Sequence, residues 1–191
     1  MNKIVLIFLI PFLNSSFFSQ EAIIIYNWEE AKLASPDTIY GISFEKQKIK
    51  TLPDSLRKFK NIKQLNLSKN QLSGLPDFIK DFQHLEVLNL DKNHFSSFPK
   101  EVLSLYNLKE LYFSRNETYK LPDEIDRLSR LTKLDLWSSA ITYFPPSLIN
   151  LKHLEFVDLR GVTYGPIFIE KITTSMNWVK FEYETPCSCV E

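Results

Sequence analysis

The chain has 191 residues, of which 44% are hydrophobic and 24% charged, a balance typical of an ordinary globular domain. Its 23 Lys and Arg are matched by 23 Asp and Glu, so the formal net charge at pH 7 is zero. This balance and the lack of a basic run argue against nucleic acid as a partner, because neutralising phosphates requires a concentrated positive face.

The first residues have the anatomy of a signal peptide. A short basic start, Met1-Asn2-Lys3, precedes an apolar run from Ile4 to Leu13 and a polar stretch from Asn14. The apolar run is shorter than the roughly 18 to 20 residues that a membrane-spanning helix needs. We therefore expect a signal peptide over residues 1–19, cleaved near Ser19-Gln20, and a mature protein that is exported (secreted, periplasmic or at the cell surface) without stable membrane insertion. A buried first strand and a membrane anchor are the alternatives.

Residues 20–38 are predicted to form an N-terminal cap. Asn27 and Glu30 have the spacing of a helix capping box. The same segment contains the apolar residues Trp28, Ala31 and Leu33, which we expect to cover the first strand of the repeats.

A Leu-Pro or Phe-Pro step then recurs every 23 residues. The five steps are Leu52-Pro53, Leu75-Pro76, Phe98-Pro99, Leu121-Pro122 and Phe144-Pro145. A fixed period in this range indicates a stack of identical units, each too small to bury its own apolar face. Six copies of the unit are legible over residues 39–166, so the sequence predicts a solenoid.

Each unit combines two kinds of apolar spacing. Leu65 and Leu67 alternate around a polar residue, as in a strand with one buried face, whereas the residues after each Pro have the spacing of a helix or 3₁₀ turn. We expect the helical residues to belong to the core: Leu56, Phe59, Ile79, Phe82, Val102, Leu105, Ile125, Leu128, Leu148 and Leu151. A recurring Asn is predicted to satisfy backbone groups where the chain leaves the strand, as a structural ladder of Asn70, Asn93 and Asn116. Ser139 and Val162 replace it in later copies.

The pattern LxxLxLxxNxLxxLPxxLxxLxx resembles the leucine-rich repeat family, in the 23-residue typical subtype that carries Leu-Pro, and is similar to exported bacterial members. The resemblance implies an α/β solenoid: a right-handed superhelix with a parallel β-sheet on its concave face and short helices or 3₁₀ turns on its convex face. It also implies that the task is protein recognition.

Residues 167–191 are predicted to form a C-terminal cap. Ile167 takes the last apolar position of the sixth copy, and Ile169 and Ile172 indicate a helix. A closing strand is expected over residues 178–182, with Val179 and Phe181 in register with Val157 and Leu159.

The two cysteines, Cys187 and Cys189, are separated by one residue. An exported protein favours a disulfide, but a local ring would be small and strained, so an intermolecular bridge and free thiols both stay open. Two Cys without nearby His cannot complete a structural zinc site, and no metal is expected.

The concave surface carries the predicted binding site. Its front half is small and polar, whereas its back half gathers aromatic and charged side chains, the residue types that dominate binding energy at protein interfaces. The candidate partner-binding residues are Tyr112, Trp137, Phe156, Trp178, Asp135, Asp158 and Arg160. The alternative is that these rings only stabilise the sheet through cross-strand pairs.

These features favour a monomeric, non-enzymatic protein that binds a protein or peptide. Asp135 and Asp158 are expected side by side, where one pKa could rise as in an acid/base pair. No nucleophile, phosphate loop or cofactor motif accompanies them, and His84, His94 and His153 fall at different repeat phases. Recognition of a carbohydrate or cell-envelope glycan by the same surface, and a purely structural envelope role, are the competing hypotheses.

Overall fold

The computed structural model describes residues 22–184. The predicted signal peptide over residues 1–19 and the pair Cys187 and Cys189 lie outside these residues. Within the described part the chain forms strands, 3₁₀ segments and two α-helices in the order β1 (Ile25–Asn27), α1 (Trp28–Ala31), η1 (Pro36–Thr38), β2 (Gly41–Ser43), η2 (Asp54–Lys58), β3 (Gln64–Asn66), η3 (Asp77–Asp81), β4 (Val87–Asn89), η4 (Lys100–Ser104), β5 (Glu110–Tyr112), η5 (Ile125–Arg127), β6 (Lys133–Asp135), η6 (Pro146–Asn150), β7 (Phe156–Asp158), α2 (Pro166–Ser175) and β8 (Lys180–Glu182).

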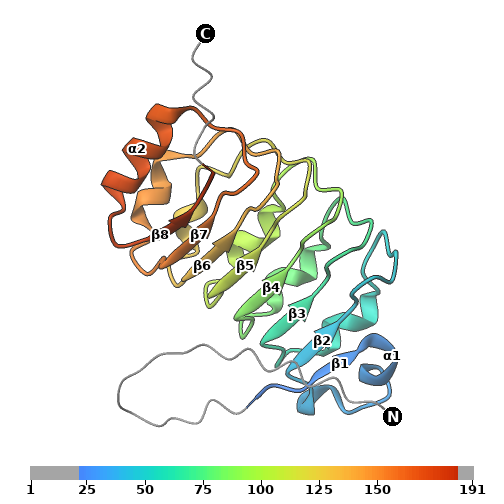
Figure 1. The fold of residues 1–191 in the computed structure, drawn as a ribbon. Helices are drawn as coiled ribbons and strands as arrows, with labels where there is room; N and C mark the ends of the chain where they lie inside the picture. The colour runs from blue at the N-terminus through green and yellow to red at the C-terminus, as the bar shows by residue number, and fades with distance from the viewer. Residues whose placement is uncertain (1–21, 185–191) are drawn as a thin grey trace.

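The eight strands of residues 22–184 form one parallel sheet in the order of the sequence, β1 to β8. From β2 to β7 the register repeats every 23 residues, so that Leu65, Leu88, Leu111 and Leu134 are successive partners. Figure 1 shows the strands stacked along one side of a curved coil and the 3₁₀ segments along the other. The predicted α/β solenoid is confirmed.

The Pro steps begin the convex segments. Pro53, Pro76 and Pro99 precede η2, η3 and η4 with φ near −70°, the value that the proline ring imposes. Their carbonyls accept hydrogen bonds from Leu56, Ile79 and Val102, which closes the first 3₁₀ turn in each unit. Proline has no N–H group to donate, but its carbonyl accepts the first hydrogen bond of the turn. The Pro steps therefore determine where each convex segment begins.

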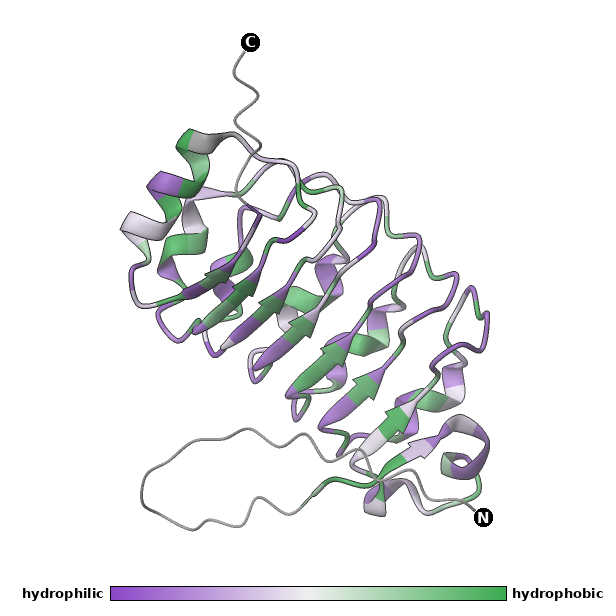
Figure 2. Ribbon diagram, viewed as in Figure 1, coloured by the Kyte–Doolittle hydropathy of each residue, from purple (hydrophilic) through white to green (hydrophobic). Residues whose placement is uncertain are grey.

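The core is continuous along the stack. All the predicted convex core residues are buried, as are the middle residues of β2 to β7. Each strand carries both hydrophobic and hydrophilic residues, because its two faces meet the core and the solvent in turn (Figure 2). No unit could bury its own apolar face, and the neighbouring coils supply the missing contacts.

Asparagines tie the coils together at the ends of the strands. Asn93 donates from Nδ2 to the carbonyls of Leu67 (3.0 Å) and Leu90 (2.9 Å), and its Oδ1 accepts from the N–H of Leu72 at 3.0 Å. Asn70 and Asn116 repeat this arrangement one coil earlier and one coil later. At the equivalent position of the next coil, the buried hydroxyl of Ser139 has no hydrogen-bond partner within the described residues.

The N-terminal end contains one strand more than the sequence predicts. β1 pairs with β2 ahead of the first repeat, and α1 follows it directly, with Asn27 Oδ1 accepting from the N–H of Glu30 at 3.0 Å. Trp28 is buried and stacks on Phe44 with ring centroids 4.9 Å apart. The prediction for Leu33 was wrong: it is 86% exposed, because α1 ends at Ala31 and Leu33 lies in the turn beyond the covered surface.

The C-terminal end is closed by α2 and β8, and Figure 1 places α1 and α2 at opposite ends of the stack. Ile169 and Ile172 are buried as expected, but Ile167 is 78% exposed at the start of α2. The predicted strand register was also wrong, because Val157 pairs with Phe181 and not with Val179. A ten-residue helix replaces the 3₁₀ segment here, and the spacing between partners becomes 24 residues.

Candidate binding surface on the concave sheet

Side chains that alternate with the buried strand residues face the concave side in columns that cross the strands. The strand pairing gives a first column of Gly41, Gln64, Val87, Glu110, Lys133, Phe156 and Lys180. The second column contains Ser43, Asn66, Asn89, Tyr112, Asp135, Asp158 and Glu182. Because neighbouring strands lie about 4.8 Å apart, successive members of one column are in direct reach of each other.

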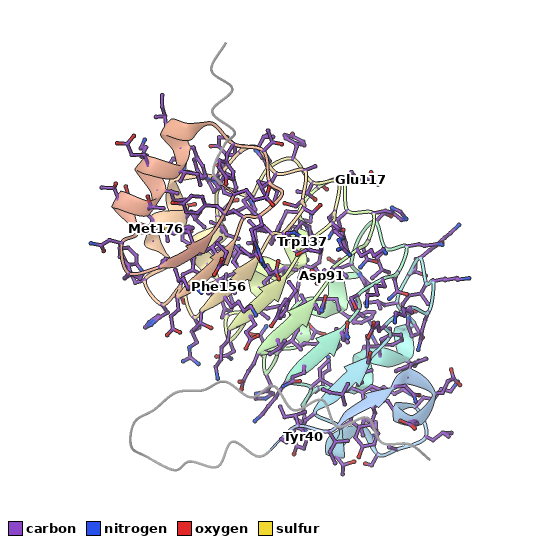
Figure 3. All side chains as sticks on the ribbon, in the orientation of Figure 1. Tyr40, Asp91, Glu117, Trp137, Phe156 and Met176 are labelled. Atoms are coloured by element: carbon purple, nitrogen blue, oxygen red, sulfur yellow. The ribbon has the colours of Figure 1, made fainter. Side chains whose placement is uncertain are left out.

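Trp137 is the large apolar side chain that this surface offers to solvent. It lies two residues beyond β6 and is 38% exposed. The guanidinium of Arg115, from the preceding coil, lies 3.9 Å from the centroid of its ring. The backbone N–H of Trp137 donates to Asp135 Oδ1 at 3.1 Å, so Asp135 fixes the strand end that carries the ring. Figure 3 shows Trp137 over the sheet.

Tyr112 and Phe156 are half-buried and alternate with lysines. The Lys133 ammonium lies 4.6 Å from the Tyr112 ring centroid and 5.6 Å from that of Phe156. The Lys180 ammonium, on the next strand, lies 5.7 Å from the Phe156 ring centroid. The Tyr112 hydroxyl donates to Glu110 at 2.6 Å and accepts from Lys133 at 3.1 Å. Burial, followed by the hydrogen bond to Glu110, raises the pKa of Tyr112, so this phenol stays protonated.

Asp135 and Asp158 are cross-strand partners, but they do not form an acid/base pair. Asp158 is 3% exposed, and Arg160 donates to both of its carboxylate oxygens, with Nη2 at 2.6 Å. Desolvation raises the pKa of Asp158, but the hydrogen bonds and charge of Arg160 outweigh it, and the net pKa is lowered. Asp158 is therefore not a carboxyl with a raised pKa, because an arginine neutralises it.

A raised carboxyl pKa is found at Asp91, two coils before Asp135 and three before Asp158. Desolvation raises the pKa of Asp91 to about 6, against a hydrogen bond from the N–H of Ser114 at 2.8 Å that lowers it. The Ser114 hydroxyl donates to Asp135, which links the two carboxylates through one serine. Figure 3 places Asp91 beside Trp137 in projection, and this chain of hydrogen bonds connects their coils.

Trp178 does not belong to the columns. It lies two residues before β8. The position beside Phe156, predicted for Trp178, is occupied by Lys180. Trp178 is exposed and lies under the Lys152 ammonium, 4.8 Å from the ring centroid. Sequence reasoning also missed Arg115, Lys133 and Lys180 as parts of the aromatic clusters, although the regular 23-residue spacing could have placed the first two.

The three histidines are not brought together. His94 contacts Glu117 across one coil at 3.3 Å, where the chain leaves the strands, whereas His84 lines a small depression with Lys63 and Glu86 at the start of the strands. Within residues 22–184, no group of three His, Cys, Asp or Glu side chains has the arrangement of a metal site. None of the helices in that range is both long and apolar enough to cross a bilayer.

Comparison with known proteins agrees with this geometry. A family model described as a leucine-rich repeat region matches residues 42–154. The solved structure of a leucine-rich repeat protein from Leptospira interrogans superposes with a TM-score of 0.68 at 31% sequence identity, over 77% of the present chain. The present chain spans 38% of the length of that protein's chain. No curated protein has a significantly similar sequence.

Proposed function

Because the chain belongs to the leucine-rich repeat family, a family of protein-interaction repeat domains, we propose that it binds a protein or peptide through the back half of its concave sheet. We call this region the concave aromatic surface and define it by Trp137, Arg115, Arg160, Tyr112 and Phe156. We further propose that the protein acts as a non-enzymatic monomer and that the predicted signal peptide directs its export.

The exposed ring of Trp137 carries this proposal. Burying the part of the ring that now faces solvent would release water from apolar surface, and tryptophan and arginine are enriched at interface hot spots. Arg115 already holds the ring in place, so little side-chain entropy is lost when a partner covers it. Arg160, anchored by Asp158, is exposed on the neighbouring coil and can donate to a partner's carbonyl or carboxylate.

Tyr112, Phe156 and Asp158 are less exposed than Trp137 and contribute to the surface in other ways. Tyr112 and Phe156 are held by Lys133 and contribute shape, while Asp158 is too buried to meet a ligand. A partner therefore meets one tryptophan between two arginine side chains, with lysine-flanked rings beside them. This is a central anchor with a charged rim, the usual anatomy of a protein interface.

The test is a binding measurement on Trp137→Ala. Peptides selected from a display library against the wild-type protein should lose affinity by about thirtyfold or more, the effect of removing an anchor worth about 2 kcal/mol. The matched control is Tyr143→Ala, which removes another exposed ring with a lysine, Lys120, over its face but lies off the concave sheet. The control variant should bind as the wild type does.

Thermal unfolding separates binding from folding. Trp137→Ala is expected to keep the wild-type thermal midpoint, because the ring is exposed and only one cation–π contact is lost. Loss of the fold, or equal binding by both variants, would contradict the proposal. Selection of glycans from an array with the same dependence on Trp137 would assign the surface to carbohydrate recognition.

A further inference from the structure

A row of cations follows the edge where the chain leaves the strands. Lys46, Lys69, Lys92 and Arg115 are one repeat apart, and each is exposed. Their backbone N–H groups continue the pairing of the sheet, donating to the carbonyls of Ser68, Asp91, Ser114 and Trp137 at 2.8 to 3.2 Å. The four residues therefore stack on successive coils with the spacing of neighbouring strands, about 4.8 Å. Figure 3 shows this edge at the label of Glu117, beyond the ends of the strands.

The backbone conformation at these positions does not call for a cation. All four residues have left-handed φ angles between 52° and 59°, and the next two coils repeat the conformation with Ser138 and Gly161. Glycine and asparagine adopt this region most easily, whereas other residues pay for the contact between Cβ and the carbonyl oxygen. The backbone therefore does not account for three lysines and an arginine at such positions.

The charge along the row is only partly neutralised. Glu45 pairs with Lys69 at 2.7 Å and with Lys46 at 3.5 Å. Lys92 forms no ion pair within the described residues, and neither does Lys48, which lies two residues after Lys46. Lys48 also has a left-handed φ of 56°. Unit charges at the strand spacing of about 5 Å would repel each other by roughly 0.8 kcal/mol in water, so a row of cations on successive strands favours a polymeric anion. The zero net charge of the whole chain conceals this local excess.

The groove along the row has the chemistry of a polyanion site. This open groove has a volume of about 700 Å³, and every residue that lines it is polar or charged. The lining includes Gln71, His94 and one carboxylate, Glu117, which contacts His94 at 3.3 Å. A protein interface would need apolar or aromatic anchors at its centre. Single-stranded nucleic acid would need aromatic platforms on which bases stack. A hydroxyl-rich, charged polymer needs neither.

We propose that this edge, the basic edge of Lys46, Lys48, Lys69, Lys92 and Arg115, binds a linear anionic polysaccharide. The cations pair with its sulfate or carboxylate groups, and the exposed Gln71 amide and His94 imidazole bond its hydroxyls. The basic edge adjoins the concave aromatic surface, with which it shares Arg115, and adds a second ligand of a different class.

The experiment measures binding of labelled heparin oligosaccharide, a sulfated chain, and of alginate, a carboxylated one, by fluorescence anisotropy. The wild type should bind at least one of them, with affinity that falls as salt rises because counterions are released. The double variant Lys69→Asn with Lys92→Asn should lose affinity by about tenfold, since it removes two contacts in the middle of the row. Asparagine fits the left-handed backbone, so the variant should fold at least as stably as the wild type.

The control variant, Lys58→Gln with Lys100→Gln, removes two exposed lysines from the convex side and should bind as the wild type does. Four results would overturn the proposal: no binding of either polysaccharide, unchanged affinity in the asparagine variant, equal loss in the control, or tighter binding of polyglutamate or poly(U). Binding of heparin but not alginate would identify sulfate as the recognised group, and the reverse would identify carboxylate.

Discussion

Replacing Asn93 with alanine removes the middle rung of the asparagine ladder. Its Nδ2 donates to the carbonyls of Leu67 and Leu90, each of which keeps a second ladder amide, from Asn70 and Asn116 respectively. The N–H of Leu72 has no such reserve, because Asn93 Oδ1 is its acceptor in this buried turn. Nδ2 also lies 3.2 Å from the Asp91 carbonyl, but its two hydrogens serve two hydrogen bonds at a time. The substitution thus deletes two hydrogen bonds and leaves one buried donor unpaired.

The magnitude follows from these contacts. Two lost hydrogen bonds contribute about 0.5 to 1.5 kcal/mol each, and a buried unpaired N–H costs about 1 to 3 kcal/mol, so the free energy of unfolding should fall by about 2 to 6 kcal/mol. Asn93 lies in the middle of the stack, and its loss weakens the coupling on both sides. Urea unfolding followed by circular dichroism measures the change as a lower midpoint.

Ser139→Ala is the matched control, because Ser139 occupies the same position two coils later and its buried hydroxyl lacks a hydrogen-bond partner. Removing an unpaired polar group should leave stability unchanged or raise it by up to about 1 kcal/mol. Equal losses in the two variants would show that the position matters through packing and not through the ladder hydrogen bonds.

Two further predictions concern charge. Burial raises the pKa of Asp91 from 3.8 to about 6, so the native state binds this proton more tightly than the unfolded chain does. The stability that this group contributes therefore falls as pH rises from about 4 to about 6. Asp91→Asn keeps an acceptor for the Ser114 N–H. The variant should gain about 1 to 2 kcal/mol more over the wild type at neutral pH than at about pH 4. The same difference between variant and wild type in urea unfolding at both pH values would refute this. Arg160→Ala leaves the buried carboxylate of Asp158 without its main donor and should lower the free energy of unfolding at neutral pH. Because the lowered pKa of Asp158 contributes stability that is lost as pH falls through it, that cost should shrink below its folded-state pKa, and a pH-independent cost would contradict the assignment.

The repeats were predictable because one short pattern states the same constraint six times. The position of each strand, the buried face and the Pro-initiated turns follow from residues within a single 23-residue unit. The end regions lack that redundancy. β1 has no repeat spacing to reveal it, and α2 lengthens the last connection by one residue, which moves Trp178 out of the sheet columns and brings Lys180 into them.

The candidate site was predictable only as a list of positions. The period places Trp137, Tyr112 and Phe156 on one face, but it cannot say which ring a neighbouring cation covers. The structure shows Trp137 exposed against Arg115, Tyr112 engaged by Glu110 and Lys133, and Asp158 buried beneath Arg160. Those differences depend on side-chain contacts between coils.

The sequence by itself determined the solenoid, its register over six coils and its core, since these depend on a hydrophobic period that each unit carries locally. Only the tertiary structure decided which polar and aromatic side chains are free. The left-handed turns that align Lys46, Lys69, Lys92 and Arg115 on one edge are stabilised by hydrogen bonds to the following coil. The charges are in the sequence, but their exposure and alignment along that edge arise from the stacking of coils, which no single unit encodes.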